Sequence, residues 1–185
     1  MKSIFRSLIF LVFIACSKDE DPLPAATKTG ANTFGCYVDG KPWVPDGKND
    51  VFNKVKAIQA GYVDPDGEPG QQDNLFFQLT MSNGDLIHLY VRNCNQPGTY
   101  FFNQNTNYLF NASFPKHNYG LYFSSKQGVF ISDSLRIGSI RFTRVEPKKG
   151  LLSGTFEFNA YSSHFNRVVK VTSGRFDIDI LKLNR

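Results

Sequence analysis

Strict alternation of apolar and polar residues in the last third of the chain constrains its fold more than any other feature. Phe156, Phe158 and Ala160 alternate there with Glu157 and Asn159. A period of two places successive side chains on opposite faces of a strand, and polar residues on one face indicate a sheet covered on one side only. The segment therefore predicts an antiparallel strand that buries one face.

The final segment repeats the pattern, with apolar side chains alternating against Asp177 and Asp179. Together with Glu157, these residues could form the carboxylate cluster that glycoside hydrolysis requires. The solvated face of any antiparallel sheet has the same composition, and we prefer that interpretation. The segment is expected to turn at Ser173–Gly174 and to continue as a strand over Arg175–Leu183.

Turn signals divide the rest of the domain into short strands. Asp39-Gly40 and Asn83-Gly84 are strong hairpin signals, and Tyr108–Phe114 is among the segments expected to be strands. No stretch keeps a helical period, so only short helical turns are expected, for example around Asp46–Asn53. The predicted fold is all-β, an antiparallel β-sandwich of about ten strands, with a closed or partly closed β-barrel as the alternative.

The first residues have the features of a secretory signal. Lys2 and Arg6 precede the apolar run Leu8–Ala15, which is followed directly by Cys16. This run is far shorter than the roughly 20 residues that span a bilayer. We therefore expect residues 1–15 to be a bacterial lipoprotein signal peptide and Cys16 to carry the lipid; an ordinary cleaved signal with an incidental cysteine is the alternative.

Polar and proline-containing sequence follows Cys16. Residues 16–32 are expected to form the lipidated cysteine and a flexible tether, and residues 33–185 a single β domain. The acidic run Ser17–Glu20 resembles the export signal of Bacteroidetes surface lipoproteins. The protein is thus expected at the outer membrane, held by the lipid on Cys16 and exposed at the cell surface, with the periplasmic face as the alternative.

Several short motifs of the domain carry a resemblance to a known family. They are Phe34–Trp43 (FGCYVDGKPW), Pro97–Tyr100 (PGTY), Leu152–Phe158 (LSGTFEF) and Val171–Asp177 (VTSGRFD). In these motifs the chain resembles a family of uncharacterised Bacteroidetes outer-membrane lipoproteins. The resemblance implies an all-β domain at the cell envelope and implies no reaction.

Charge and cysteine content narrow the possible partners. The formal net charge is +5, and no basic run is longer than Lys148-Lys149, so nucleic acid is not an expected partner. Apart from Cys16, the chain has two cysteines, Cys36 and Cys94. In an oxidising compartment they could form a disulfide, and two buried free thiols are the alternative.

Aromatic residues are the candidates for a ligand platform. Trp43 is the single tryptophan, and it could either plug one end of the core or stack on a sugar at the surface. The aromatic residues between positions 100 and 123 are too many for one sheet face, so some must lie on a second face or at a rim. Tyr119 and Tyr122 are the two candidates to join Trp43 in a platform, whereas a wide two-layer core that buries the aromatic residues is the alternative that we prefer.

Two further sites rest on short motifs. Asp64, Asp66 and Glu68 offer alternating oxygen ligands for Ca²⁺ beside a turn glycine, although an acidic turn has the same sequence. Ser134 lies in an Asp-Ser-Leu sequence that matches the pattern at which exported Bacteroidetes proteins are O-glycosylated.

No catalytic motif is present. The three histidines lack metal-ligand spacing, and neither a Gly-x-Ser-x-Gly elbow nor a phosphate-binding loop occurs. The sequence therefore predicts a non-catalytic envelope protein without a cofactor, which binds a glycan, a peptide or an envelope partner. A structural or accessory subunit of an outer-membrane assembly is the alternative, and a glycan-active enzyme is the least favoured possibility.

Overall fold

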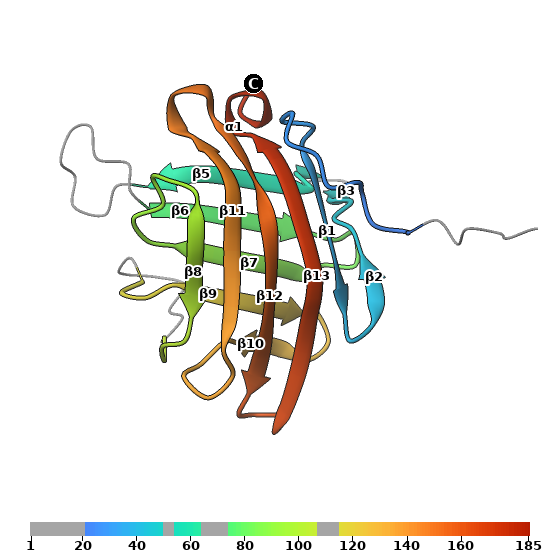
Figure 1. Ribbon diagram of the computed structural model, residues 1–185. Helices are drawn as coiled ribbons and strands as arrows, with labels where there is room; N and C mark the ends of the chain where they lie inside the picture. Colours follow the sequence, from blue (N-terminus) through green and yellow to red (C-terminus); the bar gives the residue numbers. More distant parts are fainter. Residues whose placement is uncertain (1–20, 50–53, 64–73, 107–114) are drawn as a thin grey trace, which may run out of the picture.

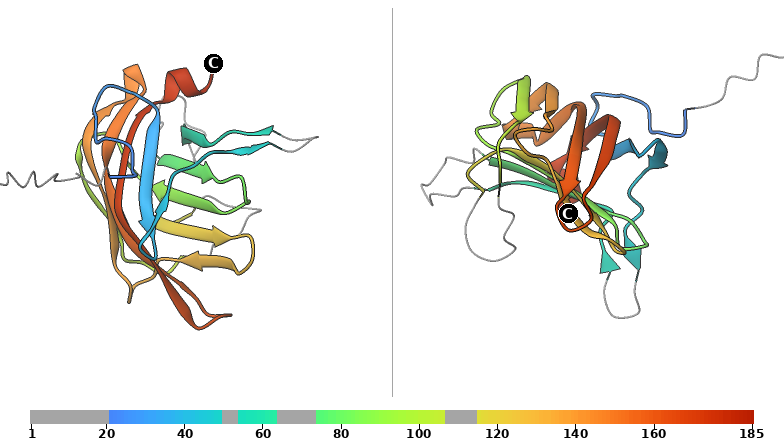
Figure 2. Two further views of the ribbon diagram at one scale, coloured as in Figure 1. Left: turned by 90° about the vertical axis from the view of Figure 1, so that its right-hand side faces the viewer. Right: turned by 90° about the horizontal axis from the view of Figure 1, so that it is seen from below.

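Two layers of β-strands make up the protein (Figures 1 and 2) in a computed structural model that describes residues 21–49, 54–63, 74–106 and 115–185. The front layer of Figure 1 contains, in spatial order, β2 (Lys41–Trp43), β1 (Thr33–Val38), β13 (Arg167–Asp179), β12 (Leu151–Ser162), β11 (Gly138–Glu146) and β8 (Gly98–Phe102). The back layer contains β10 (Gly128–Ile131), β9 (Tyr119–Ser124), β7 (Leu86–Val91), β6 (Asn74–Thr80) and β5 (Ile58–Val63).

The two layers belong to one continuous sheet. The far end of β12 leaves β11 and pairs with β10, where Ile131 lies opposite Tyr161. The result is an antiparallel sheet of 11 strands that is not closed. Strands of the back layer run across those of the front layer (Figure 1), as in orthogonally packed sandwiches. The predicted all-β antiparallel sandwich is confirmed, and the closed barrel is not formed.

Aromatic side chains fill the space between the layers. Phe77 of the back layer packs against two front-layer rings, with centroids 6.4 Å from Phe142 and 5.1 Å from Phe176. The alternation predicted the inward face of β12 and β13 correctly. Its apolar members are all buried: Phe156, Phe158, Ala160, Phe176, Ile178 and Ile180.

The predicted turn at Ser173–Gly174 is instead a β-bulge inside one long strand. Two residues of β13, Thr172 and Ser173, lie opposite the single residue Glu157 of β12. Ser173 has a φ of +52°, in the left-handed region that non-glycine residues seldom adopt. Turn-type residues therefore mark a bulge here, because the strand pairs continue on both sides of it.

Three other local predictions differ from the structure or lie outside it. The strand expected to run to Leu183 ends at Asp179, whose side chain accepts a hydrogen bond from Lys182 N and caps helix α1 (Ile180–Leu183). The helical turn expected at Asp46–Asn53 is wrong at Lys48–Asn49, which is the short strand β3 and pairs with β4 (Lys54–Val55). Tyr108–Phe114 lies outside the described residues. The remaining element is the 3₁₀ helix η1 (Pro147–Lys149).

The tether prediction is wrong for residues 21–32, which we call the N-terminal strap. The strap lies across the outer face of the front layer beside β1 and β13 (Figure 2), and its Leu23 is buried. Pro24 packs where Gly35 of β1 has no side chain: a Cβ on Gly35 would lie 2.7 Å from Pro24 Cδ. The strap can pack against β1 because Gly35 has no side chain. The folded unit therefore includes residues from Asp21 onward.

Asp177 holds the strap, which overturns the expectation that this carboxylate is solvated. Its Oδ2 accepts hydrogen bonds from Thr27 Oγ1 at 2.5 Å and Thr29 N at 2.8 Å, and its Oδ1 from Gly30 N at 2.8 Å. On the strand side, Ser153 Oγ donates to Oδ1 at 2.8 Å. Asp177 is 1% exposed, so the strap turns an outward-facing strand position into a buried one.

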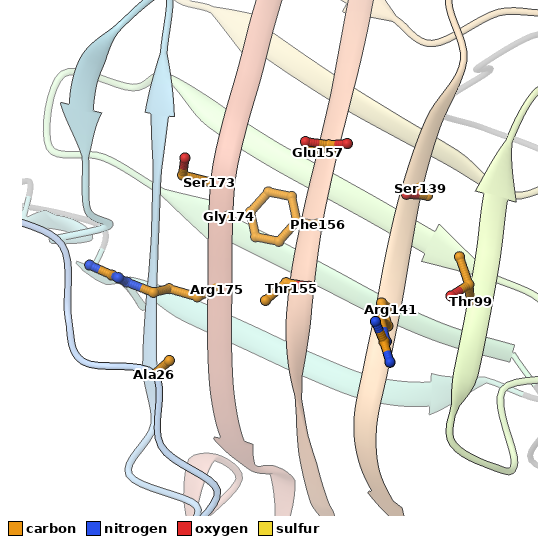
Figure 3. A pocket seen from close by; sticks show the side chains of 10 residues that line it. All are labelled: Ala26, Thr99, Ser139, Arg141, Thr155, Phe156, Glu157, Ser173, Gly174 and Arg175. Atoms are coloured by element: carbon orange, nitrogen blue, oxygen red, sulfur yellow. The ribbon is translucent and has the colours of Figure 1, made fainter.

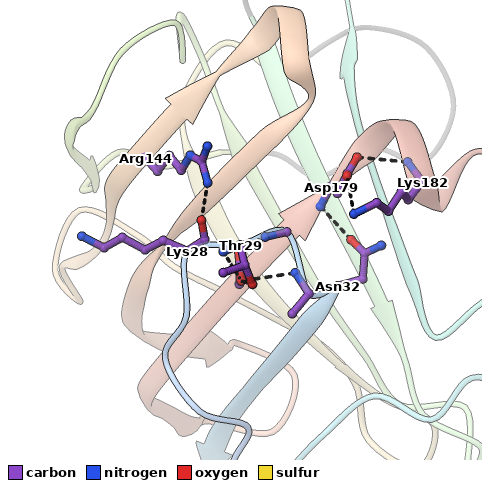
Figure 4. Close-up of polar contacts among 9 residues, drawn as sticks. Lys28, Thr29, Asn32, Arg144, Asp179 and Lys182 are labelled. Atoms are coloured by element: carbon purple, nitrogen blue, oxygen red, sulfur yellow. Dashed lines mark hydrogen bonds and ion pairs between the residues drawn. The ribbon is translucent and has the colours of Figure 1, made fainter.

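Further polar contacts hold the end of the strap (Figure 4). Asn32 Oδ1 accepts a hydrogen bond from Asp179 N at 2.7 Å, and Arg144 donates to the carbonyl of Lys28. Asp179 is also buried, and its carboxylate pairs with Lys182 at 3.0 Å. Neither aspartate is therefore available on a solvated sheet face.

Cys36 and Cys94 are buried free thiols, so the predicted disulfide is not formed. Cys36 lies on β1, whereas Cys94 follows β7 and contacts Tyr100 of β8. Since β13, β12 and β11 lie between β1 and β8, these two strands are about 19 Å apart. A disulfide needs Cα atoms within about 7 Å. Burial raises the pKa of both thiols, that of Cys94 to about 12, so they stay protonated at neutral pH.

Candidate functional site

Four neighbouring strands of the front layer bring polar side chains into one row on its outer face. Arg175 of β13 lies opposite Thr155 of β12, which lies opposite Arg141 of β11, which lies opposite Thr99 of β8. At the usual strand spacing this row is about 14 Å long. The first row of the site is thus made by three consecutive strands, β11, β12 and β13, and by the distant strand β8.

A second row runs beside the first. Glu157 of β12 lies opposite Ser139 of β11, which lies opposite Phe101 of β8. The β13 bulge faces Glu157, and Ser173 lines the pocket there together with Glu157 (Figure 3). Bulges often redirect a side chain at a binding site, and the left-handed backbone of Ser173 is consistent with such a role.

The two rows form the floor of a pocket with a volume of about 470 Å³, which lies within the usual range for small-molecule sites. Figure 3 shows side chains from β8, β11, β12 and β13 on the floor and Ala26 of the strap at one side. The lining residues are Ala26, Thr99, Ser139, Arg141, Thr155, Phe156, Glu157, Ser173, Gly174 and Arg175. Phe156 is buried in the core, so the polar groups offered to a ligand come from the hydroxyl and charged side chains of the other lining residues.

One wall of the pocket is formed by the strap together with Arg175 of β13, which binds the strap. This guanidinium pairs with the Asp21 carboxylate at 2.6 Å and donates to the Leu23 carbonyl at 2.9 Å. The backbone N–H of Leu23 and Arg175 hold the pKa of Asp21 below its usual value. Because its Nη2 already serves the strap, Arg175 acts as a fixed part of the wall.

Besides Arg175, which binds the strap, the charged residues that line the pocket are Arg141 and Glu157. Both side chains are exposed, and within the described ranges neither forms an ion pair or a side-chain hydrogen bond. They lie on adjacent rows of adjacent strands, diagonally opposite each other, where Cβ atoms are about 7 Å apart. A planar donor and a planar acceptor are therefore both free to bind a ligand between them.

This arrangement favours binding of a polar, hydroxyl-rich molecule. Guanidinium and carboxylate groups each make paired hydrogen bonds, and the Ser and Thr hydroxyls can donate or accept. Among the described residues that line the pocket Glu157 is the single carboxylate, whereas glycoside hydrolysis uses two. In the part of the chain that the structure describes, no group of three or more His, Cys, Asp or Glu side chains could hold a metal ion.

The predicted aromatic platform is wrong, because its three members are buried. Trp43 packs in the core between the layers. The hydroxyl of Tyr119 lies 2.9 Å from His88 Nδ1, and the Tyr122 hydroxyl donates to Asp85 at 2.9 Å. Burial also lowers the pKa of His88 to about 4. These side chains stabilise the fold and line no part of the pocket.

The other predicted sites are separate from the pocket. Cys16 and the calcium candidates Asp64, Asp66 and Glu68 lie outside the described residues. Ser134 is exposed, in the turn between β10 and β11, and its hydroxyl donates to Asn105 Oδ1 at 3.2 Å. Its glycosylation stays a prediction.

Sequence reasoning missed most of the pocket. Alternation within β11 could have assigned Ser139 and Arg141 to the outward face, and the pair Phe101-Phe102 must send one ring outward. Which outward residues become neighbours depends on the pairing of β8 with β11, and the sequence carried no signal for that pairing. Glu157 was identified as outward-facing, but its predicted companions Asp177 and Asp179 are held elsewhere.

Comparisons with known proteins identify a family for this chain but assign it no activity. Among the described residues, no helix is long and apolar enough to cross a membrane. No curated protein and no solved structure matches the chain. A family model described as a domain of unknown function (DUF6252) matches residues 71–177, a range that includes β6 through most of β13 and every strand residue that lines the pocket. The chain therefore belongs to the DUF6252 family.

Proposed function

We propose that this protein is a lipid-anchored cell-envelope protein whose β domain binds a glycan in the pocket on the outer face of the front layer. The proposal is carried by Arg141 and Glu157, which have no ion-pair or side-chain hydrogen-bond partner among the described residues and lie among the hydroxyls of Thr99, Ser139 and Thr155. Neighbouring hydroxyl groups of a sugar present donors and acceptors at the spacing that such planar side chains bind. A peptide or an envelope protein is the competing ligand.

Binding without catalysis is favoured because Glu157 is the single carboxylate among the described lining residues. A second carboxylate on this face, Asp177, accepts hydrogen bonds from the strap and from Ser153. Acid–base chemistry at a sugar needs one carboxyl to donate a proton while another acts as base or nucleophile. Glu157 has no such partner among the described lining residues, so retention of the sugar is the better-supported function.

Removal of the unpaired guanidinium tests the pocket. The Arg141→Ala variant should bind the best ligand of a glycan array about tenfold more weakly than wild type, since hydrogen bonds to a charged donor are lost. Isothermal titration calorimetry on the folded domain measures the change. Lys148→Ala is the matched control, because Lys148 is an exposed cation of η1 without an ion pair in the described chain. The Lys148→Ala protein should bind the ligand with the affinity of wild type.

Two results would contradict glycan binding at this site. One is an array on which wild-type protein binds nothing. The other is an Arg141→Ala variant with unchanged affinity. If cross-linking on cells then captured one envelope protein through this face, the accessory-subunit alternative would replace the glycan proposal.

The proposed anchor has its own test. Cys16→Ser should release the protein from the membrane fraction while the circular dichroism spectrum of the domain stays unchanged. Since the strap is fixed from Asp21 onward, a lipid on Cys16 would leave a link of at most about 17 Å when fully extended. A Cys16→Ser protein that stays in the membrane fraction would contradict the lipid anchor.

A further inference from the structure

Phe101 lies at the margin of the pocket and is exposed in spite of its size. It is 54% exposed, whereas the next residue, Phe102, is fully buried in the core. Phe101 is two residues from Thr99 on the same face of β8, and Thr99 lines the pocket. The aromatic ring therefore continues the floor of the pocket on the side opposite the strap.

The ring stands directly beside the polar groups. Phe101 lies opposite Ser139, and Ser139 lies opposite Glu157, so the ring is one strand spacing from the hydroxyl and two from the carboxylate. These spacings are about 5 Å and 10 Å. Arg136 over Tyr161 is the cation–π contact of the described residues, and no guanidinium covers Phe101. A single ligand can thus contact the ring and both polar partners.

An aliphatic side chain extends the apolar margin. Ile137 precedes β11, two residues before Ser139, and is 62% exposed. Polar groups on one side and a ring with an isoleucine on the other give the site an amphipathic floor. Sugar rings have the matching character: hydroxyls project from their edges, while C–H bonds line their faces.

We infer that Phe101 is the stacking platform of the site, on which the C–H face of a sugar ring packs while its edge hydroxyls reach Ser139 and Glu157. This inference rests on the proposed glycan-binding function and adds a specificity determinant to it. Sugars with an unobstructed C–H face should bind best, because bulky axial groups keep the ring away from Phe101. An aromatic ring contributes by dispersion and by its electron-rich face.

Substitution of the ring by other groups tests the inference. Phe101→Ala should weaken binding of the best array ligand about tenfold, and Phe101→Trp should retain or strengthen it, since indole offers a larger face. Phe165→Ala is the matched control. Phe165 is also a partly exposed ring, but it lies in the hairpin between β12 and β13 and stacks on Phe130, away from the pocket.

The Phe101→Trp variant adds a direct readout. The native chain has one tryptophan, Trp43, which is 5% exposed and so shielded from ligand. Titration with cellobiose, lactose, maltose and N,N′-diacetylchitobiose should change the emission of the Phe101→Trp protein and leave the wild-type emission unchanged. A ligand-dependent signal in the variant alone locates the sugar at position 101.

The outcomes separate the platform from the pocket. If Arg141→Ala weakens binding but Phe101→Ala and the Phe101→Trp emission do not respond, the platform is overturned and the glycan pocket stands. If neither substitution alters binding, the proposed function fails as well. If Arg141→Ala and Phe101→Ala each weaken binding of the array ligand, both the platform and the pocket are supported.

Discussion

Replacing Asp177 with alanine is expected to release the N-terminal strap and to lower the free energy of unfolding by about 3 kcal/mol. The Asp177 carboxylate is buried and accepts hydrogen bonds from Thr27, Thr29 and Gly30 of the strap as well as from Ser153. Hydrogen bonds to a charged acceptor are stronger than neutral ones, and their loss leaves buried donors unpaired. Detachment of the strap returns its donors to water, which limits the total effect.

The pH dependence follows from the pKa of the same carboxyl. Burial favours the neutral form, but the hydrogen bonds from Thr27, Gly30 and Ser153 outweigh it and hold the pKa of Asp177 well below its usual range. The unfolded chain, with an Asp pKa of about 3.9, therefore takes up the proton first as pH falls. The stabilisation by Asp177 should be complete above about pH 4 and should be lost as pH falls through the lower folded-state value.

Urea unfolding of wild type and Asp177→Ala between pH 7 and pH 2 measures both effects. The difference in unfolding free energy should be largest at neutral pH and should shrink below about pH 4. Trypsin should cleave the variant at Lys28 and spare the wild type, because the strap is docked only in the latter. Glu157→Gln is the control, a carboxylate on the same face without a hydrogen bond in the described chain. Equal stabilities of Asp177→Ala and Glu157→Gln would show that Asp177 does not hold the strap.

Gly154→Ala is expected to lower the free energy of unfolding by more than about 3 kcal/mol or to prevent folding, a larger effect than the same substitution at Gly61 or Gly98. A Cβ at Gly154 would lie 2.1 Å from the Arg141 carbonyl oxygen and 2.7 Å from Phe176 Cζ. The first neighbour is backbone of β11, which pairs with β12 at this point. The clash can be relieved only by separating the two strands that carry the pocket.

A graded series of substitutions gives this prediction its control. At Gly98 a Cβ would meet nothing closer than Tyr100 Cε2 at 3.8 Å, so Gly98→Ala should change stability by less than about 1 kcal/mol. At Gly61 the nearest atom is Phe76 Cε1 at 3.0 Å, a side chain that can shift. Thermal unfolding should rank the three variants in the order Gly98, Gly61 and Gly154, from mild to severe. A Gly154→Ala protein as stable as Gly98→Ala would show that β11 and β12 are not packed this closely.

Several errors of prediction have one physical cause, the pairing of segments far apart in the sequence. The strap was expected to be a flexible tether because it contains polar residues, prolines and little apolar surface. It docks because Asp177, almost 150 residues away, offers an acceptor for its backbone N–H groups, and because Gly35 leaves room for Pro24. No local pattern in residues 21–32 contains this information.

The predicted aromatic platform failed for the same reason, because local sequence does not show which aromatic residues the two layers bury. Trp43, Tyr119 and Tyr122 have the composition of a sugar site, but the layers bury all three. Phe101, which the sequence did not separate from its neighbours, is the ring that faces outward beside Ser139. Residue type indicated that an aromatic surface could exist, and strand pairing decided which ring it contains.

By itself, the sequence determined the all-β fold and the inward faces of β12 and β13, because a period of two is a local property that needs no partner strand. Outward positions of these strands have different fates in the structure: Asp177 is buried by the strap, while Glu157 and Arg141 lie in a pocket without a partner among the described residues. Tertiary structure alone decided this, because the register of β8, β11, β12 and β13 and the bulge at Ser173 set which outward side chains are neighbours. Register is fixed by the burial of the whole sheet, and no single strand specifies it.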